Sequence, residues 1–313
     1  MLTYVVRRIL AVFPVMGVVV LFVFVLIRIA PGDPAAIIAG DYASPQAIET
    51  IRVALGLDQP LHVQLRVYVT NVLRGDLGRS LHSKLPVRTL IAQRLEPTVA
   101  LTLSTLALAV TLAVPLGILA AWKAGTWVDR AVMVFAVAGF SIPVFWLGFL
   151  MIYGFAVTLD VLPVQGYVSY REDVGAFARH LVLPTLTLGL VYMALLTRIT
   201  RASMLEVLGA DYIRTAQAKG QGSRRILFGH ALKNASVPIV TTIGVGLTLL
   251  ISGVVITESV FALPGLGRLT VDAVLQRDYS IIQGVTLLSS AVYVLVNLVV
   301  DLCYLLLDPR IRY

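Results

Sequence analysis

The sequence predicts an all-α membrane protein with six transmembrane helices. Of its 313 residues, 58% are hydrophobic and 13% are charged, and the mean hydropathy is +0.89. A soluble core of this size does not need so much apolar surface. A helix that crosses about 30 Å of hydrocarbon needs roughly 20 apolar residues. Six segments meet this requirement, namely residues 9–30, 98–122, 131–158, 181–197, 237–261 and 281–307.

The first segment follows Arg7 and Arg8, so it could be the core of a signal peptide. Its apolar run is longer than the roughly 7–15 residues expected of such a core. The Pro-Gly-Asp-Pro stretch at 31–34 also makes a poor cleavage site, because small residues are preferred there. We therefore expect a retained transmembrane helix.

The distribution of charge predicts the topology. With six spans, both termini lie on the same side of the membrane. If that side is the cytoplasm, the inner segments hold 13 Lys or Arg and 4 Asp or Glu in 61 residues, whereas the outer segments hold 11 of each sign in 108 residues. All the excess positive charge then lies inside, as membrane topology requires and nucleic-acid binding does not.

The outer segment 31–97 is too long for a simple connection and contains helix signals of its own. One helix can start at Pro45 and end at Gly56. A second can start at Pro60, and a third can start at Pro86 and lead directly into the second span. We expect a small helical extracytoplasmic cap on the membrane surface, within a single domain that spans residues 1–313.

The cytoplasmic loop, residues 198–236, carries seven basic residues and two acidic ones. A helix can start at Asp211 and be stopped by Gly220. A second helical stretch at 223–234 ends before Pro238, which can start the fifth span. Two short helices would form a knob suited to docking into a partner. The pattern alone equally allows a basic loop that rests on anionic lipid.

The sequence offers no set of residues for catalysis or metal binding. There is one cysteine, Cys303, and the four histidines (His62, His82, His180 and His230) lack ligand spacing. No nucleophile and base converge within the predicted spans, which argues against an intramembrane enzyme. No Walker A pattern occurs, so any ATP must be bound by another chain.

Ionisable residues inside predicted spans invite a functional interpretation because burying them in lipid is costly. Arg28 lies near the outer end of the first span and can reach the headgroups. Glu258 is a candidate gate or docking contact, or else an anchor for the loop that follows. Asp301 lies one turn from Asn297 on the sixth span, where bonding between helices is favoured over contact with a solute.

The cytoplasmic loop reads Asp-Tyr-Ile-Arg-Thr-Ala-Gln-Ala-Lys-Gly at 211–220 and His-Ala-Leu-Lys-Asn at 230–234. This pattern resembles the coupling loop of ABC importer permeases, and more narrowly their peptide, glutathione and nickel branch. The resemblance covers nearly the whole chain, in order. The further matching stretches are Pro-Gly-Asp-Pro at 31–34, Leu-Gly-Leu-Asp-Gln-Pro-Leu at 55–61, Gly-Asp-Leu-Gly-Arg-Ser at 75–80, Glu-Ser-Val-Phe-Ala-Leu-Pro-Gly-Leu-Gly at 258–267 and Asp-Pro-Arg-Ile-Arg-Tyr at 308–313.

The loop departs from the general importer pattern at two places. Arg-Thr-Ala at 214–216 replaces the Glu-Ala-Ala of importers at large. The ending of the pattern has His230 where isoleucine is usual, and its proline comes later, as Pro238. Both departures resemble sequences of the peptide branch, so they favour that branch within the importer permeases. Within that branch Asp211 replaces a more usual glutamate and keeps a carboxylate at a helix N-terminus.

The resemblance implies one permease subunit of an importer in the bacterial inner membrane. Its partners would be a second homologous permease, one or two cytoplasmic ATPase subunits that bind ATP and Mg²⁺, and an extracytoplasmic solute-binding protein. This chain itself would need no cofactor. The residues expected to dock the ATPase are Asp211, Tyr212, Thr215, Ala216, Ala218, Lys219 and Gly220.

Peptides are the expected solute, with glutathione and nickel complexes as alternatives from the same branch. An ion-coupled secondary transporter fits less well, because neither a mid-membrane relay of ionisable residues nor an internal repeat is evident. An ATP-driven exporter subunit does not explain the extracytoplasmic cap.

Overall fold

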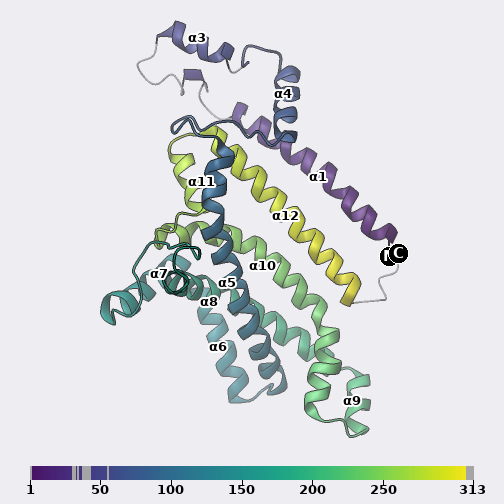
Figure 1. Cartoon of the computed structure of the whole chain (residues 1–313). Coiled ribbons are helices and arrows are strands. Elements are labelled where there is room, and N and C mark those ends of the chain that lie inside the picture. The colour runs from purple at the N-terminus through teal and green to yellow at the C-terminus, as the bar shows by residue number, and fades with distance from the viewer. Residues whose placement is uncertain (1, 30–32, 34, 37–43, 55, 308–313) are drawn as a thin grey trace. The chain divides into compact units, whose positions relative to one another are not determined.

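The structure is a computed structural model that describes residues 2–29, 33, 35, 36, 44–54 and 56–307. In this part of the chain it is all-helical, with one isolated β-bridge between Arg79 and Pro86 (Figure 1). Parts of the motifs at 31–34 and 55–61, and the whole 308–313 motif, lie outside the described residues. The chain divides into two compact units, of which unit 1 comprises Met1–Val6, Glu96–Arg268 and Leu295–Tyr313, and unit 2 comprises Arg7–Leu95 and Leu269–Val294.

Long apolar helices dominate the described residues, as the sequence predicts. Four are long and apolar enough to cross a membrane, namely α1 (Leu2–Ile29), α5 (Val87–Trp122), α8 (Val174–Leu208) and α12 (Tyr279–Leu307). A further helix, α10 (Leu232–Val260), has 29 residues. Prolines lie inside α1, α5, α8 and α10 without ending them. A proline has no N–H to donate to the carbonyl oxygen one turn before it. Long membrane helices tolerate a proline because neighbouring groups donate to that carbonyl oxygen instead.

The predicted span at 131–158 is not a single straight helix. It is divided into α6 (Trp127–Ser141), α7 (Val144–Met151) and the π-helix η1 (Ile152–Thr158), with a bend of 102° between the segments on either side of residues 142 and 143. Pro143 lacks an N–H and forces the residue before it out of the helical region, so Ile142 is extended with φ −85° and ψ 126°.

The helices predicted between the first two spans are present. α3 (Pro45–Ala54) and α4 (Leu61–Leu73) are short, and Val87 begins α5 without a further break. The chain turns after α3 at Gly56, whose φ of +66° lies in the region that favours glycine. Helix α11 (Leu266–Leu275) precedes α12.

A buried carboxylate organises part of unit 2. Asp278 accepts hydrogen bonds from Ser80 Oγ at 2.6 Å, from the Leu81 N–H at 2.9 Å and from the Ile281 N–H at 3.3 Å. His82 Nε2 lies 2.8 Å from the carbonyl oxygen of Gln276. The turn before α5 is thereby fixed to the start of α12.

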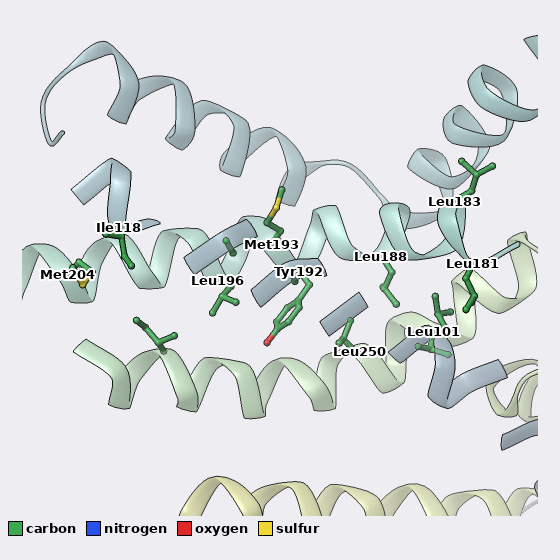
Figure 2. Close-up of a cluster of buried hydrophobic side chains, with 14 of the residues drawn as sticks. Leu101, Ile118, Leu181, Leu183, Leu188, Tyr192, Met193, Leu196, Met204 and Leu250 are labelled. Atoms are coloured by element: carbon green, nitrogen blue, oxygen red, sulfur yellow. The ribbon is translucent and has the colours of Figure 1, made fainter. Parts of the chain in front are cut away.

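Unit 1 is built around α8, of which 61% of the apolar window is buried. Figure 2 shows its buried side chains, among them Leu188 and Leu196, beside α10 and its Leu250. Tyr192 points toward α10 and donates to the carbonyl oxygens of Thr242 and Ile243, both at 3.2 Å. The ring of Tyr192 fills the space that a Cβ on Gly246 would need, so these two helices pack closely only because residue 246 is glycine.

Candidate functional site

Helix α8 continues well past the predicted end of the fourth span, from residue 197 to Leu208. The predicted span marks the apolar segment, and the helix itself continues beyond that segment. Only Gly209 and Ala210 separate α8 from the next helix. The first part of the predicted cytoplasmic loop, residues 198–208, is therefore a helical extension of α8.

The helix predicted to start at Asp211 is confirmed as α9 (Asp211–Ala218), which lies at the end of α10 in Figure 1. Its predicted stop is also confirmed. Gly220 has φ +74°, its N–H donates to Gln217 O at 2.9 Å, and the N–H of Gln221 donates to Ala216 O at 3.2 Å. This pair of bonds is a Schellman motif, which terminates a helix at a left-handed residue.

The two faces of α9 differ in burial. Ile213 and Ala216 are buried, and they pack the helix against the rest of unit 1. The other six residues predicted to dock a partner are exposed, namely Asp211, Tyr212, Thr215, Ala218, Lys219 and Gly220. Arg214 is also exposed and pairs with Asp211 at 3.3 Å. The geometry thus presents a polar outer face, while Ala216 supports it from the inner side.

The second predicted helix of the loop does not end before the fifth span. The chain is continuously helical from Ser223 through the π-helix η2 (Arg225–Ala231) into α10, and Pro238 lies inside α10. His230 closes the turn by a 2.7 Å contact between its Nε2 and Gln221 Oε1. Both ends of the α9 region are therefore joined to long helices of unit 1.

An ion pair at the base of this region was not predicted. Arg201 on α8 donates from Nε to Asp129 Oδ1 at 2.5 Å and from Nη2 to Oδ2 at 2.7 Å. Asp129 on α6 also accepts from the Gly125 N–H at 3.0 Å, and its side chain is 6% exposed. The bidentate geometry fixes the extension of α8 to α6.

Helix α5 supports the same part of α8. A Cβ on Gly117 would lie 2.6 Å from Thr200 Cβ and 2.9 Å from Thr197 O, so the close approach of α5 to α8 requires a glycine there.

The sequence carried one signal for the ion pair between Asp129 and Arg201, which is an acidic residue in the first turn of a helix after a short loop. The partner of Asp129 lies 72 residues away, so sequence spacing did not identify it.

Glu258 lies near the end of α10 and is fully buried. Its carboxylate accepts from Thr98 Oγ1 at 2.5 Å and from the Arg268 N–H at 3.0 Å, and Thr98 Oγ1 accepts in turn from the Leu266 N–H at 2.8 Å. A Cβ on Gly265 would overlap the carboxylate. These contacts anchor the loop after α10, one of the two roles considered for Glu258. A role as a gate stays a prediction.

Asn297 and Asp301 lie one turn apart on α12, as predicted. Asn297 is exposed and Asp301 is partly buried. Nearby, Tyr304 Oη donates to Thr241 Oγ1 at 2.7 Å and so connects α12 to α10. Contact of either residue with a solute stays a prediction.

Within the described residues, no group of His, Cys, Asp and Glu side chains could hold a metal ion.

Comparison with known proteins identifies the family. The model of the binding-protein-dependent transport system inner membrane component matches residues 113–313, and the model of the N-terminal part of such membrane components matches residues 1–102. In fold, the chain is similar to a chain of the MetNI methionine ABC transporter, solved in inward-facing conformations. The TM-score is 0.57 at 19% identity, over 71% of this chain and 97% of the other.

Three relatives match over almost their whole length. A probable peptide ABC transporter permease protein of Sinorhizobium fredii is 53% identical over 99% of both chains. A putative peptide transport system permease protein of Brucella abortus is 43% identical, and the glutathione transport system permease protein GsiC of Escherichia coli is 44% identical, both over 100% of each chain. The chain therefore belongs to the family of binding-protein-dependent transport system inner membrane components, the permease subunits of ABC importers.

Proposed function

We propose that this permease forms half of the pathway of an ATP-driven importer for di- and oligopeptides. Support for the solute comes from two relatives whose names specify peptide transport, one of them 53% identical to this chain. Glutathione is the alternative, because a glutathione permease is 44% identical over the full length. Nickel complexes, the third solute of this branch, have no support among these relatives.

The proposed membrane topology has six spans. They are α1, α5, the bent segment from α6 to η1, α8, α10 and α12. Six spans place both termini on one side, and the excess of Lys and Arg in the segments on that side assigns it to the cytoplasm. In this topology α3 and α4 belong to an extracytoplasmic cap, and α9 lies in the cytoplasm.

The observation that carries the coupling proposal is the construction of α9. A short helix has a polar, exposed face and a buried face, and only two residues separate it from α8. A cytoplasmic ATPase that binds the exposed face would therefore move a rigid body. Closure of the ATPase pair on ATP would shift α8 and α10, because packed helices change between discrete arrangements.

The proposed assembly contains a second homologous permease, one or two cytoplasmic ATPase subunits and an extracytoplasmic solute-binding protein. The family description, binding-protein-dependent transport, supports the last of these. Selectivity would rest mainly with the binding protein, because few polar side chains lie within the apolar helices. If a binding protein of different specificity is exchanged and the transported solute stays the same, selectivity resides in the permeases instead.

Uptake in proteoliposomes that contain the complete complex tests the function. We expect a labelled tripeptide to accumulate only with ATP and the binding protein, and to keep accumulating when ionophores abolish ion gradients. Loss of uptake on adding ionophores would indicate an ion-coupled carrier. Competition by unlabelled dipeptide, oligopeptide, glutathione and nickel complexes then identifies the solute.

A further inference from the structure

A hollow in unit 2 lies between the end of α1 and helix α4. Its volume is about 230 Å³. Most of its exposed lining surface is apolar, but five of the eight described lining residues have polar side chains, one of them a cation and none of them a carboxylate. The lining residues are Arg28, Gly56, Gln59, Val63, Gln64, Val67, Tyr68 and Asn71.

The guanidinium of Arg28 is held in one orientation. Nη1 donates to the carbonyl oxygen of Phe24 at 2.8 Å, and Nη2 donates to Gln64 Oε1 at 2.5 Å. Its Cζ lies 3.4 Å from the centroid of the Phe24 ring. Gln64 is itself fixed, because its Nε2 donates to the carbonyl oxygens of Leu57 and Gln59. Arg28 is thus built into the wall of the hollow.

Two polar atoms at this hollow are enclosed without a hydrogen-bond partner among the described residues. They are Arg28 Nε and Tyr68 Oη. Burial raises the pKa of Tyr68 to about 12, although the charge of Arg28 acts in the opposite direction. The hydroxyl therefore keeps its proton at neutral pH and can donate. A buried donor without an acceptor is costly, and a cation without a counter-charge is more so.

We infer that this hollow binds an oxyanion, the phosphate group of a membrane phospholipid, through Arg28 and Tyr68. A phosphate supplies the negative charge that the described lining lacks, together with acceptor oxygens for the two donors that have no partner. The flank of α1 next to Arg28 suits the lipid tails, because Phe22 is 61% exposed and Ile29 is 77% exposed. The headgroup binds in the hollow and the acyl chains follow α1. This inference does not depend on the proposed transport function.

Native mass spectrometry of the complete importer complex, purified in mild detergent with added phosphatidylglycerol, measures the retained lipid. The only charge of this lipid is its phosphate. We expect Arg28→Gln to lower retention about tenfold, because a charge-assisted interaction is lost, and Tyr68→Phe to lower it about fivefold. Arg66→Gln is the matched control, since Arg66 is an exposed arginine of α4 that does not line the hollow. This control should leave retention unchanged.

Equal retention by the wild type, Arg28→Gln and Tyr68→Phe overturns the lipid site. Tyr68→Phe removes one hydroxyl and keeps the ring, so it provides the test even if Arg28→Gln does not assemble. A thermal-shift titration with inorganic phosphate, in lipid-depleted detergent, separates the two sources of the oxyanion. If phosphate stabilises the protein only when Arg28 is present, while all variants retain lipid equally, the hollow is an oxyanion site. Its ligand is then a dissolved phosphate and not a phospholipid. Absence of both effects refutes the site altogether.

Discussion

Gly220 ends α9 with φ +74°, a conformation that costs a residue with a Cβ about 1–2 kcal/mol. We expect Gly220→Val to distort the Schellman motif and to reduce solute-stimulated ATPase activity, while the complex still folds. The measurement is the ATPase rate of the reconstituted complex with and without solute-loaded binding protein.

Gly222→Ala is the control for this substitution. Gly222 has ordinary φ, and a Cβ there meets nothing within 4 Å. Its ATPase rate should match the wild type. Unchanged assembly and unchanged stimulated activity in Gly220→Val would remove Gly220 from the docking role.

The buried pair of Asp129 and Arg201 allows a second test at the scale of single residues. Removing Asp129 leaves a guanidinium partly buried without its partner. We expect Asp129→Ala to destabilise the protein by about 2 kcal/mol, less than for a fully buried pair because the Arg201 side chain is 26% exposed. The double variant with Arg201→Ala should lose less than the sum of the single variants, as measured by thermal unfolding in detergent.

The exposed pair of Asp211 and Arg214 is the matched comparison. Its side chains are 95% and 74% exposed and lie 3.3 Å apart. Such surface pairs contribute little to stability. Arg214→Ala should therefore leave the unfolding temperature unchanged. Additive losses in the double variant of Asp129 and Arg201 would show that the bidentate contact is not what holds α6 to α8.

At the scale of elements, the packing of α8 on α10 depends on the contact between Tyr192 and Gly246. A methyl group at residue 246 would occupy the position of the tyrosine ring. We expect Gly246→Ala to destabilise the protein by about 1–3 kcal/mol, since excess volume in a packed interior forces side chains and backbone apart. Thermal unfolding measures the loss. Gly17→Ala on α1 is the control, because a Cβ there meets nothing within 4 Å; equal stability of both variants would contradict close packing at Gly246.

Local signals explain which elements the sequence predicted well. Helix α9 and its stop at Gly220 depend on helix propensity and a left-handed glycine, both readable from ten consecutive residues. The end of α8 and the inclusion of Pro238 in α10 depend instead on helical structure that continues through polar residues. Hydropathy reports the apolar segment and does not report where helical hydrogen bonding ends, so it did not predict how far these helices continue.

Long-range contacts explain what the sequence could not predict in the candidate site. Ala216 was assigned to the docking surface with its neighbours, and only the packing of α9 shows that it faces inward. Arg201, which pairs with Asp129, lies 72 residues from it. Thr98, one of the partners of Glu258, lies 160 residues from it. The sequence shows that these charged residues lie near helix ends, whereas the residues with which they pair depend on the tertiary fold.

At the scale of the whole molecule, the proposed topology can be tested by cysteine accessibility. Cys303→Ser removes the only cysteine of the chain, and single cysteines are then introduced at exposed Ser83 or exposed Ser223. We expect a membrane-impermeant maleimide to label Ser83→Cys in intact spheroplasts, and Ser223→Cys only after permeabilisation. The reverse pattern would invert the topology, and labelling of both sites in intact spheroplasts would refute the six-span arrangement.

The ion pair between α6 and α8 also has a consequence for biogenesis. The ribosome makes the chain from its N-terminus, so Asp129 emerges 72 residues before Arg201. During that interval the carboxylate lacks its bidentate partner, although the Gly125 N–H is already available, and leaving such a charge buried without its partner is costly. We therefore expect the start of α6 to pack stably only after α8 has been synthesised, so that the order of translation sets the order in which these two helices assemble.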